Sequence, residues 1–428
     1  MNQQSFNQEL FEFLQSSPTP FHCVENLITK LQNDGFTFLP ESSHWNLERG
    51  GRYVTTRDNG SLVAFIFGDS DPDQGKLHLV GSHTDSPCLK IKPEPDISRA
   101  GYNQVGVEVY GGVLLNPWFD RDLSIAGRLT YLNSNGDIAN ALINFQQPIA
   151  IIPSLAIHLD REANNSRSIN AQNHLYPVIG LAGDDSLSLR EHLSCQFNKE
   201  HENLNLEQIL DYDLSFYDCQ APSLIGINGE FIASARLDNL LSCFIGLKAL
   251  QNSSAGSTTT ILACHDHEEV GSMSAGGAQG PFLDTVLHRL FPDRSERSRI
   301  LSRSLMVSAD NAHAVHPNFK EKHDSNHQPV LNGGPVIKFN ANQRYATNSE
   351  TAAMFRSFCH QAEVAVQTMA MRNDMACGST IGPISASELG VSVVDIGVPQ
   401  WAMHSIRETA GAKDSFDLYR VLQTFFNS

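Results

Sequence analysis

Four short apolar runs, each ending in polar or turn-forming residues, recur along the chain and predict buried strands. They cover residues 76–83, 258–265, 304–309 and 391–398. A continuous apolar run of this length is typical of a strand that is covered on both faces. Apolar residues recur at helical spacing in residues 240–250, 351–365 and 416–426. Strands that alternate with helices predict an α/β fold, with a mostly parallel central sheet and helices on both faces.

The pattern changes between about residue 99 and about residue 234. Val and Leu alternate with other residues in 106–115 and 125–132, and long helical periods are few. This texture predicts a β-rich domain, residues 99–234, inserted into a domain that is formed by residues 1–98 and 235–428. Two polar stretches of the insert, residues 164–173 and 200–213, are expected to be loops or mobile surface elements.

Composition limits the partners and the compartment. The 428 residues are 41% hydrophobic and 18% charged, which is a globular composition, and the length exceeds that of one ordinary core. A formal charge of −17 disfavours nucleic acid and anionic membrane surfaces as partners. The eight cysteines are widely scattered without a C-x-x-C pair, as expected of thiols in a reducing compartment. With no signal peptide and no long apolar span in the sequence, we expect a cytoplasmic protein.

The first candidate site residues follow the first predicted strand. Residues 81–87 read GSHTDSP, and His83 could bind a metal ion while Asp85 holds the other ring nitrogen. A turn histidine beside a capping aspartate is the simpler interpretation of this pair alone. Asp238 lies just before the helical pattern of residues 240–250, where an aspartate is ordinarily a helix cap.

A stronger signal follows the second predicted strand. Residues 265–271 read HDHEEVG, so two adjacent glutamates, Glu268 and Glu269, stand at a strand end. One could bind a metal ion while the other serves as a base near a metal-bound water. An H-E-x-x-H zinc helix is absent because position 271 is glycine.

Two further candidates follow the third and fourth predicted strands. Asp310 comes directly after residues 304–308, and His404 follows residues 391–398 and a short turn. Because ligands bind beyond the carboxyl ends of strands in open α/β sheets, we expect these residues to converge with the earlier clusters. His313 and His316 are expected either to line the same pocket or to support its ligands from behind. The sequence contains no G-x-S-x-G and no phosphate-binding glycine loop, so a serine nucleophile and nucleotide cofactors are unsupported.

Motifs spread over nearly the whole chain resemble those of one known family, the M18 or aspartyl aminopeptidases. They are residues 17–22 (SPTPFH), 81–87 (GSHTDSP), 155–159 (LAIHL), 234–239 (SARLDN), 265–272 (HDHEEVGS), 308–311 (SADN), 334–338 (GPVIK), 343–346 (QRYA), 377–383 (CGSTIGP) and 403–408 (MHSIRE). The resemblance implies a zinc aminopeptidase-like catalytic domain, formed by the two outer segments, and an inserted dimerisation domain.

The resemblance also implies roles for individual residues. Asp238 would bridge two divalent metal ions, expected to be zinc, with His83 and Asp310 on one ion and Glu269 and His404 on the other. Glu268 would be the general base and acid, and Asp85 would support His83. His158, in the inserted domain, would reach the active site of a neighbouring subunit. The substrate side would be formed by Lys338, Tyr345, Gly378 and Ser379, with Lys338 meeting an acidic side chain.

The predicted function is therefore removal of the N-terminal residue from peptides with a free N-terminus, with Asp or Glu preferred. The resemblance further implies a homo-oligomer, a dodecamer built from dimers. One alternative is an enzyme of the same fold that prefers neutral N-terminal residues. Another is a non-catalytic, metal-bound assembly protein, against which the presence of Glu268 argues because a purely structural metal site needs no base.

Overall fold

The computed structural model describes residues 2–69, 75–183, 187–254 and 256–428, and these residues form two compact units. The first unit comprises Met1–Ser86, Pro222–Met403 and Glu408–Ser428, and the second comprises Pro87–Ala221 and His404–Arg407. From the sequence, the insert was expected to begin at residue 99 and to end at residue 234. Each of these boundaries lies about a dozen residues later in the chain than the boundary in the structure. The sequence did not indicate that the chain returns to the second unit at His404–Arg407.

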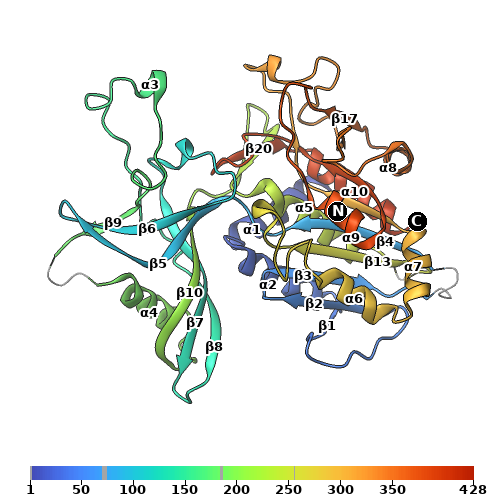
Figure 1. Ribbon diagram of the computed structural model, residues 1–428, viewed down its shortest axis with the longest axis horizontal. Coiled ribbons are helices and arrows are strands. Elements are labelled where there is room, and N and C mark those ends of the chain that lie inside the picture. Colours follow the sequence, from blue (N-terminus) through green and yellow to red (C-terminus); the bar gives the residue numbers. More distant parts are fainter. Residues whose placement is uncertain (1, 70–74, 184–186, 255) are drawn as a thin grey trace. The chain divides into compact units, whose positions relative to one another are not determined.

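The first unit is built on a nine-stranded sheet with the order β1-β2-β3-β13-β4-β14-β18-β16-β17 (Figure 1). Its strands are β1 (Thr37–Phe38), β2 (Arg52–Arg57), β3 (Ser61–Ile66), β4 (Leu77–His83), β13 (Thr259–His265), β14 (Leu305–Ala309), β16 (Val336–Phe339), β17 (Gln367–Ala370) and β18 (Ser392–Gly397). The four strands predicted from the apolar runs are β4, β13, β14 and β18, and they form the parallel centre of the sheet.

The whole sheet is mixed, so the expectation of a mostly parallel sheet was too simple. Strand β3 is antiparallel to both β2 and β13, and β16 is antiparallel to β18. Only three residues separate β2 from β3, and a connection this short can join only antiparallel neighbours. The fold is a mixed α/β fold with several sheets.

Helices cover both faces of the central sheet. Successive side chains of each strand point to opposite faces, so one strand contributes to two cores. In β13, Leu262 and Cys264 join a core with helices α1 (Gln3–Ser16), α2 (Pro20–Asn33), α5 (Leu237–Gln251), α8 (Ser349–Gln361) and α10 (Asp414–Phe426). Ile261 and Ala263 join a second core with α6 (Phe282–Leu290), α7 (Arg294–Ser302) and α9 (Ile381–Leu389). The three predicted helical patterns correspond to α5, α8 and α10.

A smaller sheet of the first unit carries residues that adjoin the candidate site. Its order is β11-β12-β20-β19-β15, and its strands are Ser223–Ile225, Phe231–Ser234, Glu408–Gly411, Pro399–Trp401 and Ala312–His313 in that order. Two short 3₁₀ helices, η2 (Glu268–Val270) and η3 (Lys320–Lys322), lie in loops of the same unit.

The second unit contains a six-stranded antiparallel sheet with the order β8-β7-β10-β5-β6-β9. Its strands are β5 (Cys88–Arg99), β6 (Tyr102–Tyr110), β7 (Leu123–Asn133), β8 (Ile138–Asn144), β9 (Val178–Leu181) and β10 (Leu206–Asp218). Helix α4 (Leu189–Glu200) packs Leu193 and Phe197 into the core of this unit. The remaining helical elements are η1 (Asn116–Trp118) and α3 (Ala163–Ser166).

The polar stretch 200–213 was expected to be a loop or a mobile surface element, and the loop alternative is wrong, since most of the stretch belongs to the end of α4 and to β10. Register shifts at Leu206/Gln208 and at Ile209/Asp211 interrupt the alternation of buried and exposed side chains in β10. A bulged strand loses the strict period of two that marks a strand in a sequence.

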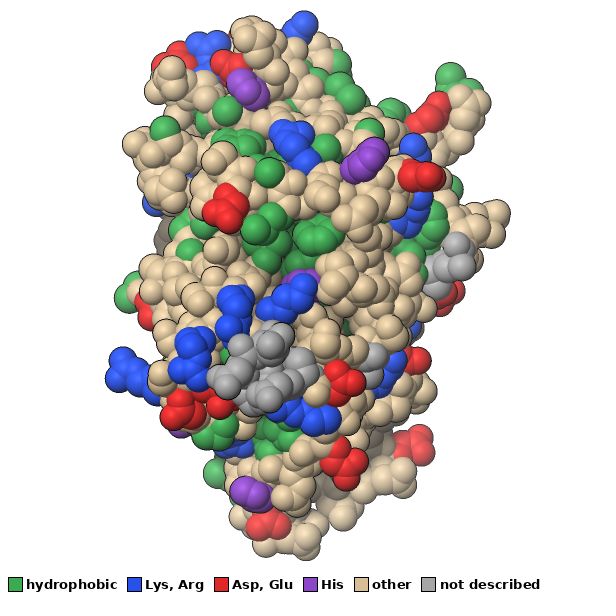
Figure 2. Space-filling view, turned by 90° about the vertical axis from the view of Figure 1, so that its right-hand side faces the viewer, with side chains coloured by type: hydrophobic (Ala, Val, Ile, Leu, Met, Phe, Trp, Pro, Cys, Tyr) green, Lys and Arg blue, Asp and Glu red, His purple; other side chains and the backbone are tan. Residues whose placement is uncertain are grey.

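Two surface properties are plain. Among the helices of the described residues, none is both long enough and apolar enough to cross a membrane. On the face drawn in Figure 2, acidic and basic side chains are interspersed.

Candidate metal centre and active site

Three ligand-type residues converge where elements of the first unit begin or end. His83 is the last residue of β4, Asp310 directly follows β14, and Asp238 lies in the first turn of α5. Strands β4 and β14 are parallel neighbours, so their carboxyl ends meet at one edge of the sheet. This is the convergence that the sequence predicted for these three residues.

The distances make His83, Asp238 and Asp310 one compact group. His83 Nε2 lies 3.3 Å from Asp238 Oδ1 and 3.6 Å from Asp310 Oδ1. One ligand atom from each of the three residues lies within 4.8 Å of the others. His83 is 1% exposed and Asp238 is 2% exposed, so the group faces little solvent.

The other ring nitrogen of His83 is held by Asp85. Its Nδ1 lies 3.0 Å from the backbone carbonyl of Asp85 and 3.3 Å from Asp85 Oδ1. A histidine that donates from Nδ1 presents Nε2 as its ligand atom, which is the arrangement found in protein metal sites. Burial lowers the pKa of His83, but Asp238, Asp310 and Asp85 together raise it well above its ordinary value. The surrounding carboxylates therefore favour positive charge at this position.

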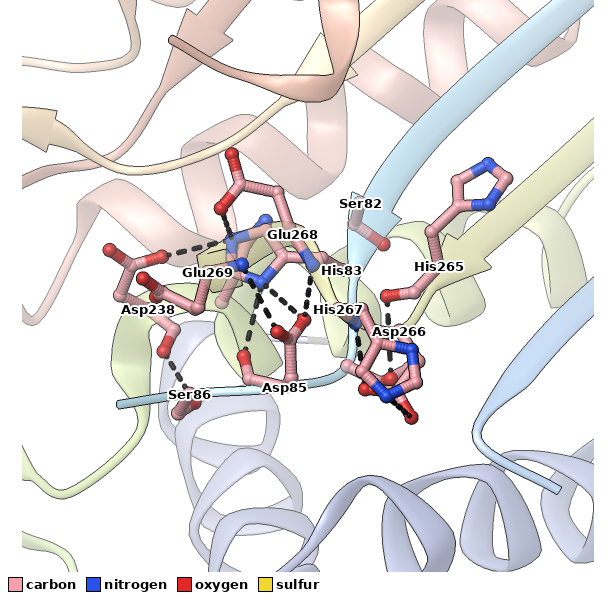
Figure 3. Close-up of polar contacts among 12 residues, drawn as sticks. Ser82, His83, Asp85, Ser86, Asp238, His265, Asp266, His267, Glu268 and Glu269 are labelled. Carbon is pink, nitrogen blue, oxygen red and sulfur yellow. Dashed lines mark hydrogen bonds and ion pairs between the residues drawn. The ribbon is translucent and has the colours of Figure 1, made fainter. Parts of the chain in front are cut away.

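Asp85 also fixes the loop that carries the two glutamates (Figure 3). Its Oδ1 accepts the backbone N–H of Glu268 and its Oδ2 accepts that of Glu269, both at 3.1 Å. The sequence predicted a contact between Asp85 and His83, but it gave no sign of this second one. Asp85 therefore ties the end of β4 to the start of η2.

The two glutamates lie in a crowded acidic environment. One ligand atom each from His83, Glu268 and Glu269 lies within 4.8 Å of the others. Burial, together with the charges of Asp310 and Asp238 and against the opposing charge of His83, raises the pKa of Glu268 to about 7. Burial, followed by the charge of Asp238, raises the pKa of Glu269 well above its usual range. A cation at this place would relieve the repulsion among these carboxylates.

Asp238 is held by contacts that the sequence did not predict. Its backbone N–H donates to Glu408 Oε2 at 2.9 Å, and its carbonyl accepts the hydroxyl of Ser86 at 2.6 Å. Glu408 is buried in β20. The motif that contains Glu408 was noticed in the sequence, but only the fold brings it to the start of α5.

His404, the fifth predicted ligand, belongs to the second unit. Its Nδ1 lies 3.1 Å from the carbonyl of Gly112, in the same unit. A ring held at Nδ1 in this way presents Nε2 as its other nitrogen, as His83 does. His404 directly follows Met403, the last residue of the central segment of the first unit.

The predicted substrate residues fall into buried and exposed pairs. Lys338 is 2% exposed, and its Nζ lies 3.2 Å from Asp310 Oδ2 and 5.2 Å from the centre of the Tyr345 ring. Burial raises the pKa of the Tyr345 hydroxyl. Gly378 and Ser379 are exposed, and Ser379 Oγ donates to the carbonyl of Arg344 at 3.2 Å.

His313 and His316 line a cavity of the first unit. The cavity has a volume of about 360 Å³, and Met369, Trp401 and Met403 are among its other walls. Burial, followed by the charge of Lys338, lowers the pKa of His313. A neutral, half-buried histidine can accept or donate a hydrogen bond in this wall.

His158 lies on an exposed turn of the second unit and not on a strand. Its neighbours Leu155, Ile157 and Leu159 are 56%, 49% and 74% exposed. The histidine makes no hydrogen bond or ion pair with any residue in the described ranges. The described residues of its own chain therefore do not hold the ring of His158 in place.

The donor set of the first unit fits a divalent metal ion. One imidazole nitrogen and several carboxylate oxygens are ligands that zinc accepts, and manganese and cobalt can also bind such a set. The ring of His83 is already oriented by Asp85, as metal-binding histidines usually are. The group of His83, Asp238 and Asp310 is also buried, and its carboxylates outnumber its one imidazole.

Comparison with known proteins agrees with this chemistry. Residues 13–426 match the family described as Aminopeptidase I zinc metalloprotease (M18). The chain belongs to the M18 family. The Probable M18 family aminopeptidase 2 of Ectopseudomonas mendocina (strain ymp) is 56% identical over 422 residues, which are 98% of this chain and 98% of that protein.

Solved structures share the whole M18 fold. A chain in the structure of the Ape4 and Nbr1 complex is 38% identical with a TM-score of 0.94, and the match covers 99% of this chain and 86% of that chain. A chain of the S. cerevesiae mApe1 dodecamer is 29% identical with a TM-score of 0.83, and the match covers 98% of this chain and 95% of that chain. The M18 metallo-aminopeptidase assignment therefore rests on sequence and on fold.

Proposed function

We propose that this M18 chain is a dinuclear metal-dependent aminopeptidase that releases N-terminal Asp or Glu from peptides. The observation that carries the proposal is the buried group of His83, Asp238 and Asp310, whose ligand atoms lie within 4.8 Å of one another. These three residues hold the first ion. Asp238 would be shared with a second ion, which Glu269 and His404 would also hold.

Two divalent ions supply a Lewis acid for the scissile carbonyl, a water of lowered pKa and a site for the free α-amine of the peptide. Glu268 accepts the proton from the attacking water and returns it to the leaving amine. Asp85 holds the backbone of Glu268 and orients His83, which keeps the base and the ligand in one arrangement.

Metal content tests the proposal directly. We expect elemental analysis of the saturated protein to give close to two ions per chain, and chelation to abolish peptide hydrolysis, as two-metal sites require. His83→Ala should lower the bound metal, whereas His192→Ala, a change at an exposed histidine of α4, should not. A metal-free protein with full activity would refute the proposal.

Lys338 is proposed as the residue that meets the acidic side chain of the substrate. Lys338→Met should remove about 2–3 kcal/mol of transition-state binding for N-terminal Asp, and less for a neutral residue such as Ala. The effect is measured as the ratio of the kcat/KM values for two peptides that differ only in their N-terminal residue. Lys413→Met, at an exposed lysine, is the control.

The contact of Lys338 with Asp310 provides a second measurement in the same experiment. If Lys338 serves only to hold Asp310, metal content will fall and both substrates will lose rate equally. That result would contradict the acidic specificity. An unchanged metal content with a selective loss for Asp would support it.

We also propose that the enzyme works as a homo-oligomer, a dodecamer built from dimers, and that the second unit is its dimerisation domain. The likeness to a chain of the S. cerevesiae mApe1 dodecamer supports the assembly. The exposed turn of Leu155, Ile157, His158 and Leu159 supports a contact with a second copy, because apolar side chains grouped on a surface often mark an interface. His158 then completes the active site of the neighbouring subunit.

A further inference from the structure

Asp395 is a buried carboxylate that the proposed mechanism does not use. It lies in the middle of β18 and is 0% exposed. Its Oδ2 accepts the backbone N–H of Ala346, and its Oδ1 accepts the hydroxyl of Thr380, both at 2.6 Å. A buried charge needs such partners to offset the loss of water.

The two donors adjoin residues proposed to bind substrate. Ala346 follows Tyr345, and Thr380 follows Ser379. The backbone N–H of Asp395 also donates to Thr347 Oγ1 at 2.9 Å. Asp395 thus holds both the loop that contains Ala346 and the loop that contains Thr380. A hydrogen bond from Ser379 Oγ to the carbonyl of Arg344 also joins these two loops.

Asp395 also stands beside Lys338. Strands β16 and β18 pair Val336 with Gly397 and Ile337 with Ile396. This antiparallel register, continued by one residue, brings Lys338 opposite Asp395. Directly opposite residues of antiparallel strands project from the same face of a sheet. Asp395 therefore adjoins all three segments on the proposed substrate side.

The start of α9 is shaped to admit this carboxylate. A Cβ atom at Gly382 would lie 2.3 Å from Asp395 Oδ1 and 2.4 Å from Oδ2, so a larger residue would displace the helix or the carboxylate. Thr380, the N-cap of α9, accepts the backbone N–H of Gly382 at 3.3 Å. Helix N-termini favour negative charge nearby, which further stabilises the buried anion.

We propose that Asp395 is a positioning residue that fixes Tyr345, Ser379 and Lys338 in the arrangement that receives the N-terminal residue of the substrate. The inference rests on the proposed function and adds a specificity element outside the metal centre. Loops that are ordered before binding lose less conformational entropy when the substrate arrives. Loosening them therefore weakens substrate binding and leaves the metal centre intact.

The test uses a matched pair at Thr380 and one change at Asp395. Thr380→Val preserves the shape and removes the hydroxyl, whereas Thr380→Ser retains the hydroxyl. We expect Thr380→Val to raise KM about 10-fold with kcat changed less than about two-fold, because the interaction is made equally in the ground state and the transition state. Thr380→Ser should restore the KM of the wild type. Asp395→Asn replaces one acceptor oxygen by an amide donor that faces a donor, so its KM should rise at least as much.

Asp414→Asn is the control for a general loss of stability. Asp414 is also 0% exposed and accepts the backbone N–H groups of Asn332 and Gly334 at 2.6 Å and 2.8 Å. This change should lower the unfolding temperature and leave KM near that of the wild type. Metal content should stay at the wild-type level in all four variants.

Three results would overturn the inference: an unchanged KM in both Thr380→Val and Asp395→Asn, a loss of metal that accounts for the loss of rate, or a defect in Thr380→Val that serine does not repair. Failure of the proposed function is a separate result, since the wild-type protein would then release no N-terminal residue with zinc, cobalt or manganese. That result would remove the basis of the inference as well.

Discussion

Glu268→Gln should lower turnover by about 10²-fold or more while the metal content stays near that of the wild type. Glutamine keeps the shape of the side chain but cannot accept the proton of the attacking water. The backbone N–H of Glu268 still donates to Asp85 Oδ1 in this variant, so the loop keeps its anchor. Steady-state kinetics and elemental analysis on the same preparation measure both quantities.

Glu269→Gln is the matched comparison for this experiment. The two residues are adjacent and both are anchored by Asp85, but Glu269 is proposed as a ligand. We expect Glu269→Gln to lose metal, and to recover part of its activity when the metal concentration is raised. Both glutamates lie close to His83, so the alternative to be tested is that Glu268 is the ligand and Glu269 the base. Metal loss in Glu268→Gln with only a mild effect on rate would mean that the two roles are exchanged.

His158→Ala should bind metal normally and yet lose most of its turnover. A donor that stabilises the oxyanion is worth about 3–4 kcal/mol when it is removed, which corresponds to a loss of about 10²- to 10³-fold. His158 lies on an exposed turn of the second unit, which is the unit proposed to form the dimer. The change His192→Ala, at another exposed histidine of that unit, should leave turnover unchanged.

Mixing the two inactive variants tests whether the site is shared between chains. In a hetero-oligomer of Glu268→Gln and His158→Ala chains, some sites combine an intact Glu268 from one chain with an intact His158 from the other. Activity should therefore return after subunit exchange. If exchange is verified by mass spectrometry and no activity returns, or if a dilute monomer is fully active, His158 does not act across an interface.

The parts of the fold that the sequence predicted are those determined by local pattern. The central parallel strands are buried on both faces and therefore appear as continuous apolar runs, as in β4 and β14. His83 and Asp310 could be predicted because each lies at the end of such a run. The mixed character of the sheet could not, because strand direction depends on connections such as the short one between β2 and β3.

The contacts that support the site depend on pairings between distant segments. Glu408 reaches Asp238 only because β20 joins the smaller sheet, and Asp395 reaches Ala346 and Thr380 only through the register of β18. A single aspartate in an apolar run such as residues 391–398 gives no indication of its partners. One usable signal was present: a charge inside a buried strand must be compensated by the fold, and this marks Asp395 for attention.

The division of the first unit into three stretches of chain has a consequence for synthesis on the ribosome. All six strands of the sheet in the second unit come from Pro87–Ala221, so this sheet can form while later residues are still being added. The first unit cannot finish in the same way, since α10 (Asp414–Phe426) packs Phe416 and Tyr419 against Phe6 of α1, with ring centres 5.6 Å and 5.2 Å apart. Phe6 of α1 also packs against Phe244 of α5, with ring centres 5.2 Å apart, but the packing of α1 is complete only when α10 has been made. Synthesis of α10, rather than emergence of the candidate ligand residues, is then the event that completes the packing of the first unit.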